Sequence, residues 1–576
     1  MGTRDEIAIK SLSSNDLLFS KIVSSLILLS LRIVCYSRSV FKIYFMFRSL
    51  NPLRLADLDY ETTQNERNTN DATEATQIQE FYKDTNIFVT GATGFLGNIL
   101  LEKLLRSCHN LSTIYILVRS KKGKTVNTRI EEIFDDVLFD RMKKINPKFQ
   151  HKIVGIAGDC SLPDLGLSSQ DRKTLIEETH IVFHVAATVR FDEKLKTAVD
   201  INVRATEYML NLARSMPKLK SFIHVSTAYA NCTGDVIEEK IYPPAMDHKK
   251  LITMSDILSE KLLDTLTPTI LDKYPNTYAF TKQIAEDVVK THGENLPVGI
   301  TRPSVVISTY KEPVKAWINN MYGCTGMVAG AGLGLIRTMY CDGNVNANVV
   351  PVDMCVNSMI TAAWDVSEKF IEAKTQNKEY EIPVYNFESS NECAITWNEF
   401  MGTNLKYGVN VPSSRAIWYF CFSLQSNYFL YLLFRFFLHT VPAYIVDGAL
   451  LCMGQKPKMY NVYRKIHKFS GVLSYFTKKT WIFKSNNVQR VCKKLSKRDN
   501  EIFFCDLSQI NWDEYSKHFI RGIRIYLVND PMETLPQAIV RWKRLYWAHQ
   551  IVKTVCALLF LSFLWIVVNS ILNFSF

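Results

Sequence analysis

The segment TNIFVTGATGFLG at residues 85–97 constrains the fold more than any other part of the sequence. Apolar and β-branched residues run into Gly91, Gly94 and Gly97, and the leucine-rich stretch NILLEKLL follows. Between a strand and a helix, such glycines give a tight turn, a close approach of backbone to a pyrophosphate, and close helix–strand packing. Three glycines alone are a weak signal, so their meaning depends on the rest of the chain.

Strand-like and helix-like patterns alternate from residue 85 to about residue 365. Apolar runs such as TIYILVR, KIVGIAGD, HIVFHVAA, KSFIHVSTAY and VGITRPSVV are separated by helical patterns such as TRIEEIFDDVLFDRM and VRATEYMLNLARSM. This alternation predicts βαβ units and an α/β fold with a doubly wound parallel sheet. Wholly apolar strands fit a sheet covered on both faces. In that context the glycine turn predicts a dinucleotide site.

The end of the second predicted strand indicates which dinucleotide. TIYILVR ends in Arg119, and Lys121, Lys122 and Lys124 follow. An acidic residue there would hold the ribose 2′-hydroxyl of NAD, whereas a cation accommodates the 2′-phosphate of NADP. A solvated basic loop is the alternative, and we expect NADPH.

Tyr278 and Lys282, in TYAFTK, are candidate catalytic residues. Their i, i+4 spacing places both on one face of a helix. A lysine cation close to a phenol lowers the pKa of the phenol and makes it a proton donor or acceptor near neutral pH. Ser226 and Thr227 end the apolar strand KSFIHV, where ligands bind in open parallel sheets, although strand-end hydroxyls also cap turns.

Length, charge and cysteines bound the rest of the molecule. The 576 residues exceed one ordinary domain, and the net charge of +12 is concentrated in the C-terminal third. No acidic residue lies between Asp447 and Asp499, where thirteen lysines and arginines accumulate. This run favours an anionic partner, such as a lipid surface, ligand phosphates or nucleic acid, over a merely solvated face. The 13 cysteines show no zinc-ligand spacing, so no metal site is expected.

The C-terminus predicts a membrane helix. No charge follows Lys553, and the uncharged stretch 554–576 is long enough to span a bilayer. Basic residues at 541–544 precede it, which favours a cytosolic location for the preceding domain. A second apolar segment, AIWYFCFSLQSNYFLYLLF at residues 416–434, could span the membrane, lie in its interface or line an apolar channel.

The N-terminus is less informative. The uncharged run IVSSLILLS between Lys21 and Arg32 is too short for a span and lacks a convincing cleavage site for a signal peptide. We expect residues 1–50 to form an interfacial or poorly ordered extension. Residues 51–80 are polar and read as a disordered linker, so the folded part is expected to start near Phe81.

Several stretches together resemble a known family. GATGFLG with Tyr278 and Lys282 resembles the extended short-chain dehydrogenase/reductases. The stretches YILVRSKKGK, HVAATVRFDE, IHVSTAYANC, YPNTYAFTK, TRPSVV, YFTKKTWIFKSNN and FFCDLSQINWDEY are more specifically similar to the insect branch of the alcohol-forming fatty acyl-CoA reductases, the male-sterility-like family. The resemblance covers about residues 78–576.

The resemblance implies site residues position by position. The implied catalytic residues are Tyr278, Lys282, Thr227 and Ser226, with Thr227 favoured over Ser226 as the hydroxyl partner. The implied cofactor-binding residues are Thr90, Gly91, Thr93, Gly94, Phe95, Leu96, Gly97, Arg119, Lys122, Asp159, Ala186, Ala187, Asn202, Pro303 and Ser304. His184 and His224 lie within strands and are expected to be satisfied core residues.

The implied reaction is reduction of a long-chain acyl-CoA by two NADPH to a primary alcohol and CoA. The expected organisation is a reductase domain at 81–370, a mostly helical C-terminal domain at 371–550 and a transmembrane helix at 554–576. The implied partners are acyl-CoA and membrane lipid, not nucleic acid, with one or two membrane passes at the endoplasmic reticulum or peroxisome. The alternatives are a membrane-bound dehydrogenase acting on a sterol or nucleotide sugar, and a catalytically silent membrane scaffold.

Overall fold

The computed structural model describes residues 74–120 and 123–574. The predictions for residues 1–50, for most of the 51–80 linker and for Lys122 lie outside these residues. Ordered structure begins earlier than expected, because α2 (Gln77–Tyr82) starts within the predicted linker. The Thr76 hydroxyl accepts from the Gln79 amide, and the Gln79 side chain accepts from the Thr76 amide, which caps this helix reciprocally.

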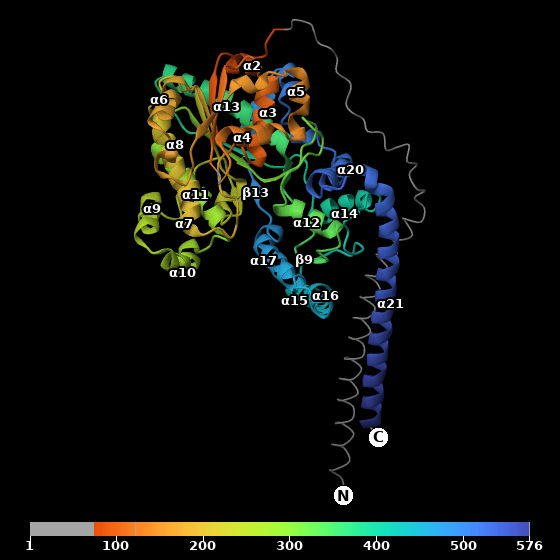
Figure 1. The fold of residues 1–576 in the computed structure, drawn as a ribbon. Helices are drawn as coiled ribbons and strands as arrows, with labels where there is room; N and C mark the ends of the chain where they lie inside the picture. Colours follow the sequence, from red (N-terminus) through yellow and green to blue (C-terminus); the bar gives the residue numbers. More distant parts are fainter. Residues whose placement is uncertain (1–73, 121–122, 575–576) are drawn as a thin grey trace, which may run out of the picture. The chain divides into compact units, whose positions relative to one another are not determined.

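A seven-stranded parallel sheet forms the centre of the first two thirds of the chain (Figure 1). Its order is β11 (Val384–Phe387), β7 (Val298–Pro303), β5 (Ser221–Val225), β4 (Ile181–His184), β1 (Asn86–Thr90), β2 (Thr113–Val118) and β3 (Ile153–Ala157). The strand order reverses between β1 and β4, which is where doubly wound sheets bind ligands. The predicted doubly wound α/β fold is therefore confirmed.

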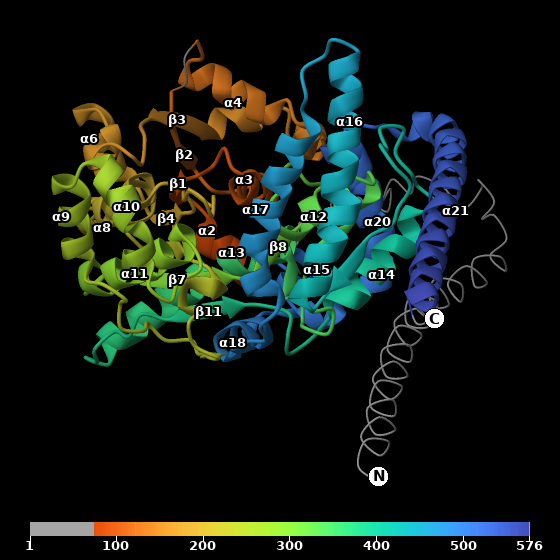
Figure 2. The same cartoon turned by 90° about the horizontal axis from the view of Figure 1, so that it is seen from below.

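Helices cover both faces of this sheet (Figure 2). On one face, α3 (Phe95–Ser107) and α13 (Val352–Thr375) share a core with Ile87 and Val89 of β1. On the other, α8 (Ala205–Arg214) and α11 (Thr277–His292) share a second core with Phe88. Successive strand side chains point to opposite faces, so one short apolar strand contributes to both cores.

Shorter elements complete the N-terminal two thirds. The helices are α4 (Val126–Phe134), α5 (Asp140–Ile145), α6 (Ser169–Glu178), α7 (Leu195–Ala198), α9 (His248–Ile257), α10 (Glu260–Leu271) and α12 (Gly323–Gly332). The tighter and wider turns include 3-10 segments η2 (Val137–Phe139), η3 (Phe149–Lys152), η4 (Pro163–Gly166) and η6 (Ala228–Asn231), and π-helix η5 (Val199–Arg204).

The C-terminal helices extend the same core. α14 (Trp397–Gly408) packs on α20 (Trp512–Gly522), with Phe400 and Phe519 rings 6.0 Å apart, and both rings belong to the core cluster of α3 and α13. The remaining short elements are α18 (Asn486–Lys494), α19 (Lys497–Ile502), η8 (Leu507–Gln509), η9 (Ile523–Leu527) and η10 (Met532–Thr534).

Three short parallel strand pairs join distant parts of the chain. β13 (Ile482–Phe483) pairs with β6 (Val236–Ile237), β12 (Ser423–Gln425) with β9 (Thr338–Tyr340), and β10 (Val349–Pro351) with β8 (Val305–Ile307). The first two bring C-terminal segments back onto the N-terminal α/β fold.

The apolar segment at 416–434 is not one helix. It contains irregular backbone and β12 before α15 (Tyr428–Arg435), which continues through η7 (Phe436–Thr440) into α16 (Val441–Cys452). Asn427 ends the irregular part because its side chain caps α15. α17 (Met459–Thr477) returns beside α16, with the Tyr444 and Tyr460 rings stacked 5.1 Å apart (Figure 2).

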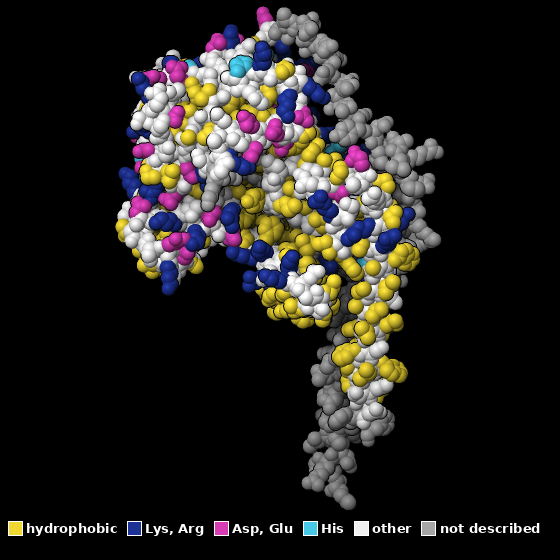
Figure 3. All heavy atoms as spheres, viewed as in Figure 1, with side chains coloured by type: hydrophobic (Ala, Val, Ile, Leu, Met, Phe, Trp, Pro, Cys, Tyr) yellow, Lys and Arg dark blue, Asp and Glu magenta, His cyan; other side chains and the backbone are white. Residues whose placement is uncertain are grey.

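Within the described residues, two helical stretches are long and apolar enough to cross a membrane, Tyr428–Cys452 and Met532–Asn573. The second contains α21 (Leu535–Phe574), which begins well before the predicted span at residue 554. Large apolar side chains are exposed along both stretches, including Phe429 at 80% (Figure 3). Such surfaces fit association with a membrane.

Candidate active site

The glycine turn after β1 has a steric reason at two of its three glycines. Gly91 has φ +74°, and a Cβ there would lie 2.6 Å from the Ala186 backbone nitrogen at the end of β4. A Cβ on Gly97 would lie 2.2 Å from the Gly91 carbonyl oxygen. The turn and the first helix are therefore packed too closely for any side chain at these positions.

The N-terminus of α3 has the character of an anion site. Gly94 is its N-cap and offers no side-chain hydrogen bond, so the first helical amides keep their donors. Thr93 and Leu96 are half-buried beside it, and the Phe95 ring stacks on Trp317 at 5.8 Å. The free amides and the positive end of the helix dipole suit a pyrophosphate.

Thr90 supports the turn from beneath. Its side chain is fully buried, and Oγ1 lies 2.8 Å from His184 Nδ1 on β4. The same oxygen accepts a hydrogen bond from the Ala186 amide at 3.3 Å. Thr90 therefore holds β1 and β4 together at the strand ends, where Ala186 and the half-buried Ala187 follow.

Arg119 and Asp159 come together at the ends of β2 and β3. Arg119 Nε lies 3.7 Å from Asp159 Oδ2, and the Arg119 side chain is 57% exposed. The other Asp159 oxygen accepts from the Ser161 amide and hydroxyl. An exposed guanidinium on this edge is available to a phosphate, with Asp159 fixing its direction.

The Tyr278 and Lys282 side chains lie on α11 near the end of β5. Asn276 caps this helix, and its Oδ1 accepts from the Ala279 amide at 2.8 Å. Tyr278 is half-buried, whereas Lys282 is buried. The Tyr278 side chain hydrogen-bonds Thr227, so one residue of the predicted hydroxyl pair meets the tyrosine directly.

Ser226 and Thr227 have different environments. The Ser226 hydroxyl donates to buried Glu286 at 2.5 Å, and Glu286 also pairs with Arg302. The Thr227 hydroxyl accepts from the Tyr229 amide at 3.3 Å and lies 3.5 Å from the Pro303 carbonyl oxygen, a long contact. Ser226 is thus committed to a buried ion pair, and Thr227 is the hydroxyl beside Tyr278.

Burial is the largest influence on the pKa values of Tyr278 and Lys282, the candidate catalytic pair. It raises the pKa of Tyr278 to about 12, and the Thr227 hydrogen bond only opposes that shift. Burial also lowers the pKa of Lys282 to about 8, against the attraction of Glu286. Lys282 is not among the causes of the shift in the pKa of Tyr278, so the expectation that Lys282 lowers this pKa stays a prediction. Tyr278 is a neutral phenol, the form that donates a proton.

His224 is a contact of Lys282 that the sequence did not reveal. Its Nε2 lies 3.3 Å from Lys282 Nζ, and burial keeps the pKa of His224 well below its usual value. The neutral ring can accept a hydrogen bond from the ammonium group. His184 is satisfied by Thr90 and Thr206, as expected, but His224 Nδ1 has no partner within residues 74–120 and 123–574. The contact between His224 on β5 and Lys282 on α11 arises from the packing of these two elements, which the sequence alone does not reveal.

Asn202 links the loop after β4 to α11 through hydrogen bonds. Its side chain bonds the Thr188 amide at 2.9 Å and donates to Thr281 at 2.9 Å. It lies in the π-helix η5, a conformation frequent at functional sites. Its position is that of a structural support for α11.

The C-terminal region supplies two residues of an aromatic lid, defined here as Phe191 and Tyr229 of the N-terminal part with Phe476 and Trp481. The Phe191 ring lies 6.0 Å from Tyr278 and 5.8 Å from Phe476. Tyr229 contacts Phe476 at 5.1 Å and Trp481 at 5.4 Å. The stretch YFTKKTWIF, held by the β13–β6 pair, thus packs on Phe191, whose ring is the one next to Tyr278.

Pro303 and Ser304 end β7 next to Thr227. The Ser304 amide donates to the Phe387 carbonyl at 3.0 Å, while its buried hydroxyl has no partner among the described residues. An unpaired buried hydroxyl costs free energy unless a ligand satisfies it. Together with the glycine turn and the free amides of α3, this fits a dinucleotide lying across the ends of β1, β4 and β7.

The basic run at 452–498 does not form one surface. Arg490 donates to Asp365 of α13, at 2.8 Å for its Nη1, and Lys494 lies 4.4 Å from the Trp364 ring centroid. These two cations hold α18 against α13. The surface expected for an anionic partner is thereby reduced to the other basic residues of the run.

Comparisons with known proteins agree with this geometry. The NAD-binding model described as male sterility protein matches residues 89–359, and a second model, Sterile, with the same description, matches residues 438–530. Residues 89–359 are thus an NAD(P)-binding domain.

Relatives match over most of the chain. Fatty acyl-CoA reductase wat of Drosophila melanogaster is 43% identical over 83% of this chain and 91% of that protein. Fatty acyl-CoA reductase 1 of Rattus norvegicus is 40% identical over 80% of this chain and 88% of that protein.

Solved structures support the fold alone. The terminal R domain of the myxalamid PKS-NRPS pathway is 18% identical with a TM-score of 0.51, covering 77% of this chain and 91% of that domain. The reductase domain of a nonribosomal peptide synthetase from Mycobacterium tuberculosis is 16% identical with a TM-score of 0.50, covering 77% and 92%. Because the two fatty acyl-CoA reductases match this chain over most of their length, the chain belongs to the fatty acyl-CoA reductase family of oxidoreductases.

Proposed function

We propose that this protein reduces a long-chain fatty acyl-CoA to a primary alcohol and CoA, with NADPH as donor in two successive steps. The observation that carries the proposal is the Tyr278–Thr227 hydroxyl pair, set between the glycine turn and an aromatic lid. NADPH, when bound, supplies a hydride to the carbonyl carbon in each step. The chain's relatives named fatty acyl-CoA reductase support the substrate class.

Tyr278 and Thr227 act on the carbonyl oxygen. Both hydroxyls donate to it while negative charge develops there, and the neutral phenol of Tyr278 then protonates it. In the first step the hemithioacetal expels CoA as thiol and leaves an aldehyde. In the second the aldehyde becomes the alcohol. Ser226 takes no direct part, since its hydroxyl is bound to Glu286.

Lys282 and its neighbours position the cofactor. In this proposal the Lys282 ammonium holds the nicotinamide ribose, His224 and Glu286 stabilise its charge, and Asn202 fixes α11. Gly91, Gly94 and Gly97 cradle the pyrophosphate. The exposed Arg119 receives the adenosine 2′-phosphate, which favours NADPH over NADH.

Lys468 and Lys479 are proposed to receive the CoA phosphates. Lys468 pairs with Asp192, adjacent in sequence to Phe191 of the lid, at 3.1 Å. Lys479, which lies between Phe476 and Trp481 in sequence, pairs with Asp235 at 2.8 Å. Both lysines therefore border the lid that faces Tyr278.

A membrane location is part of the proposal. Helix α21 would anchor the chain in the membrane of the endoplasmic reticulum or peroxisome. The basic residues at 541–544 would lie on the cytosolic side. The reductase domain would occupy residues 81–370 and the C-terminal domain 371–550.

The test uses membranes containing the full chain, incubated with acyl-CoAs of graded length and either NADPH or NADH. We expect primary alcohol with two NADPH consumed per CoA released. Accumulation of aldehyde alone would refute the second step. Turnover of a sterol or nucleotide sugar without acyl-CoA turnover would refute the substrate class.

A further inference from the structure

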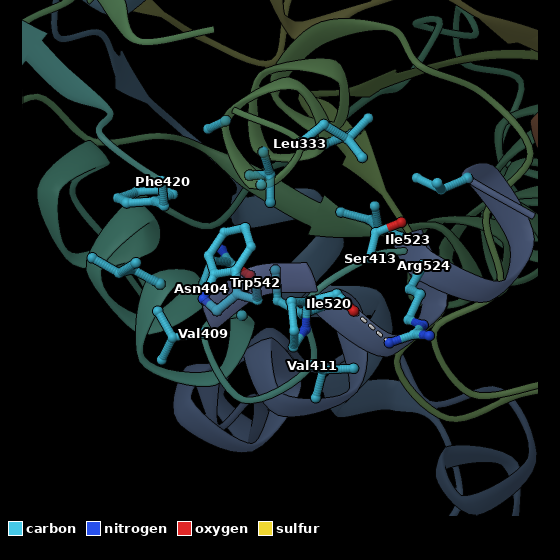
Figure 4. A pocket seen from close by; sticks show the side chains of 18 of the residues that line it. Leu333, Asn404, Val409, Val411, Ser413, Phe420, Ile520, Ile523, Arg524 and Trp542 are labelled. Carbon is cyan, nitrogen blue, oxygen red and sulfur yellow. Dashed lines mark hydrogen bonds between the residues drawn. The ribbon is translucent and has the colours of Figure 1, made fainter. Parts of the chain in front are cut away.

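An apolar pocket lies away from the catalytic tyrosine, between the C-terminal helices. The centre of a water-sized sphere can occupy about 60 Å³ of it, within about 620 Å³ of space free of protein atoms that includes open solvent. Leu333 follows α12, Asn404 belongs to α14, Ile520 to α20 and Trp542 to α21 (Figure 4). An apolar lining of this kind suits an aliphatic chain.

The polar residues that line the pocket differ in whether their side chains have hydrogen-bond partners. Ser413 donates to Asp530, and the Arg524 guanidinium donates to the Pro412 and Asp530 carbonyl oxygens. Asn404 is different: it is 2% exposed, and its Oδ1 has no partner in the described part of the chain.

The orientation of the Asn404 amide is fixed by its other end. Nδ2 donates to the Phe400 carbonyl oxygen at 2.7 Å, so a flipped amide would place two oxygens against each other. The free atom is therefore an acceptor. A thioester or aldehyde cannot donate to it, whereas an alcohol can.

Helix α12 lies between the pocket and the cluster that contains Tyr229 of the lid. α12 begins at Gly323, where an added Cβ would lie 3.8 Å from Val305, a residue packed against the apolar cluster that contains Tyr229. The last residues of α12 line the pocket. The ten residues of α12 span about 15 Å. At the pocket's other side, Trp542 lies among Arg541, Lys543 and Arg544, a sequence typical of a membrane interface.

We propose that this pocket binds one long-chain primary alcohol, with its hydroxyl donating to Asn404 Oδ1, and holds the product before it enters the bilayer. The ligand class rests on the proposed function, but the pocket and its unpaired acceptor do not. A phospholipid chain is the competing occupant, and it has no donor at its chain end.

The test is photolabelling of the full-length protein in lipid nanodiscs, without NADPH. The probe is a hexadecan-1-ol carrying a mid-chain diazirine and a terminal alkyne, and labelled peptides are mapped. We expect labels on the α12, α14 and α21 segments that line the pocket. 1-Hexadecanol should compete about tenfold better than methyl hexadecyl ether, because the ether lacks the donor.

Matched variants separate the site from general membrane labelling. Gly332→Phe should abolish the label, since Gly332 lines the pocket and its Cβ would meet open space. Gly402→Phe, on the exposed face of α14, should leave it unchanged. Asn404→Leu should reduce the alcohol-to-ether difference to less than about twofold.

Equal competition by alcohol and ether in the unmodified protein, or labels mapping elsewhere, would overturn the proposal. A parallel reductase assay keeps the two ideas apart. Labelling without acyl-CoA reduction would leave the pocket standing and refute the function. Acyl-CoA reduction without labelling would support the proposed function and refute the alcohol pocket.

Discussion

The glycines of the cofactor turn and those of the C-terminal helices serve different purposes. At Gly91 and Gly97 a side chain would lie within 2.6 Å of backbone atoms. At Gly402 on α14 and Gly471 on α17 a side chain would meet nothing within 4 Å. The cofactor side is thus shaped by close backbone contacts, whereas these helix positions leave room that the fold does not use.

The largest effect on activity is expected from a substitution at Tyr278. Tyr278→Phe removes the proton donor and should lower kcat about 10³-fold for both reduction steps. NADPH affinity, measured by fluorescence titration, should stay within about twofold, because the ring remains. A variant that kept most of its kcat would show that another group protonates the oxygen.

Gly91→Ala tests the close backbone contacts of the glycine turn directly. The added Cβ would overlap the Ala186 backbone in a left-handed conformation, so NADPH affinity should fall about 100-fold. The thermal unfolding midpoint should also fall. Unchanged NADPH binding in the folded variant would contradict the phosphate-cradle assignment.

Thr227→Val and Ser226→Ala form a matched pair at the strand end. Loss of the Thr227 hydroxyl should reduce kcat about 10-fold to 100-fold with little change in stability, since one donor to the developing oxyanion disappears. Ser226→Ala should instead destabilise the protein by about 1–3 kcal/mol, because a buried Glu286 bond is lost, with kcat nearly unchanged. The opposite pattern would reverse the two roles.

NADPH affinity should depend on pH through Lys282. Its charged form binds the ribose and is lost as pH rises through about 8, so affinity should fall there. Because burial lowers the pKa of Lys282 in the folded state, the unfolded chain binds more protons between pH 8 and the usual value of 10.5. Its contribution to stability in the cofactor-free protein should therefore rise over that window.

His224 sharpens that measurement. His224→Phe removes the acceptor 3.3 Å from Lys282 Nζ and should move the alkaline limb of NADPH binding to lower pH by roughly one unit. His224→Asn keeps an acceptor, so its alkaline limb should lie close to that of the unmodified protein. A purely structural role would lower stability in both variants and leave the limb in place.

The smallest effect belongs to the open glycines. Gly471→Ala within α17 should raise the free energy of unfolding by about 0.5–1 kcal/mol, because alanine loses less entropy in a helix. Reductase activity should not change. A clear loss of stability would mean that α17 packs against something at this face.

Local patterns carry most of the fold prediction. The glycine turn, the alternating strands and helices, and the Tyr278–Lys282 spacing each depend on residues within one or two turns, so the sequence reveals them. The second apolar segment, predicted at 416–434, starts and ends too early, because the helical stretch runs from Tyr428 to Cys452. Asn427 caps a helix there that residues 416–426 do not join.

Contacts between distant segments could not be predicted. His224 is one apolar-strand residue among several until β5 is set against α11, and only then does it face Lys282. Trp481 and Phe476 read as ordinary aromatic residues of a basic run, although they form the lid. Ser226 and Thr227 are hard to distinguish in sequence because Glu286, which separates their roles, lies on another element.

The aromatic lid also sets the order in which the molecule can become active. The Trp481 indole donates to the Cys232 carbonyl oxygen across 249 residues of chain. Ribosomes deliver the N-terminal strands first, and domains generally fold as they emerge. The dinucleotide fold can therefore assemble while the lid is still being synthesised. The nascent protein completes the aromatic lid only shortly before α21, a helix that is apolar enough to cross a membrane, is synthesised, so completion of the candidate site and synthesis of this helix are neighbouring events in its biogenesis.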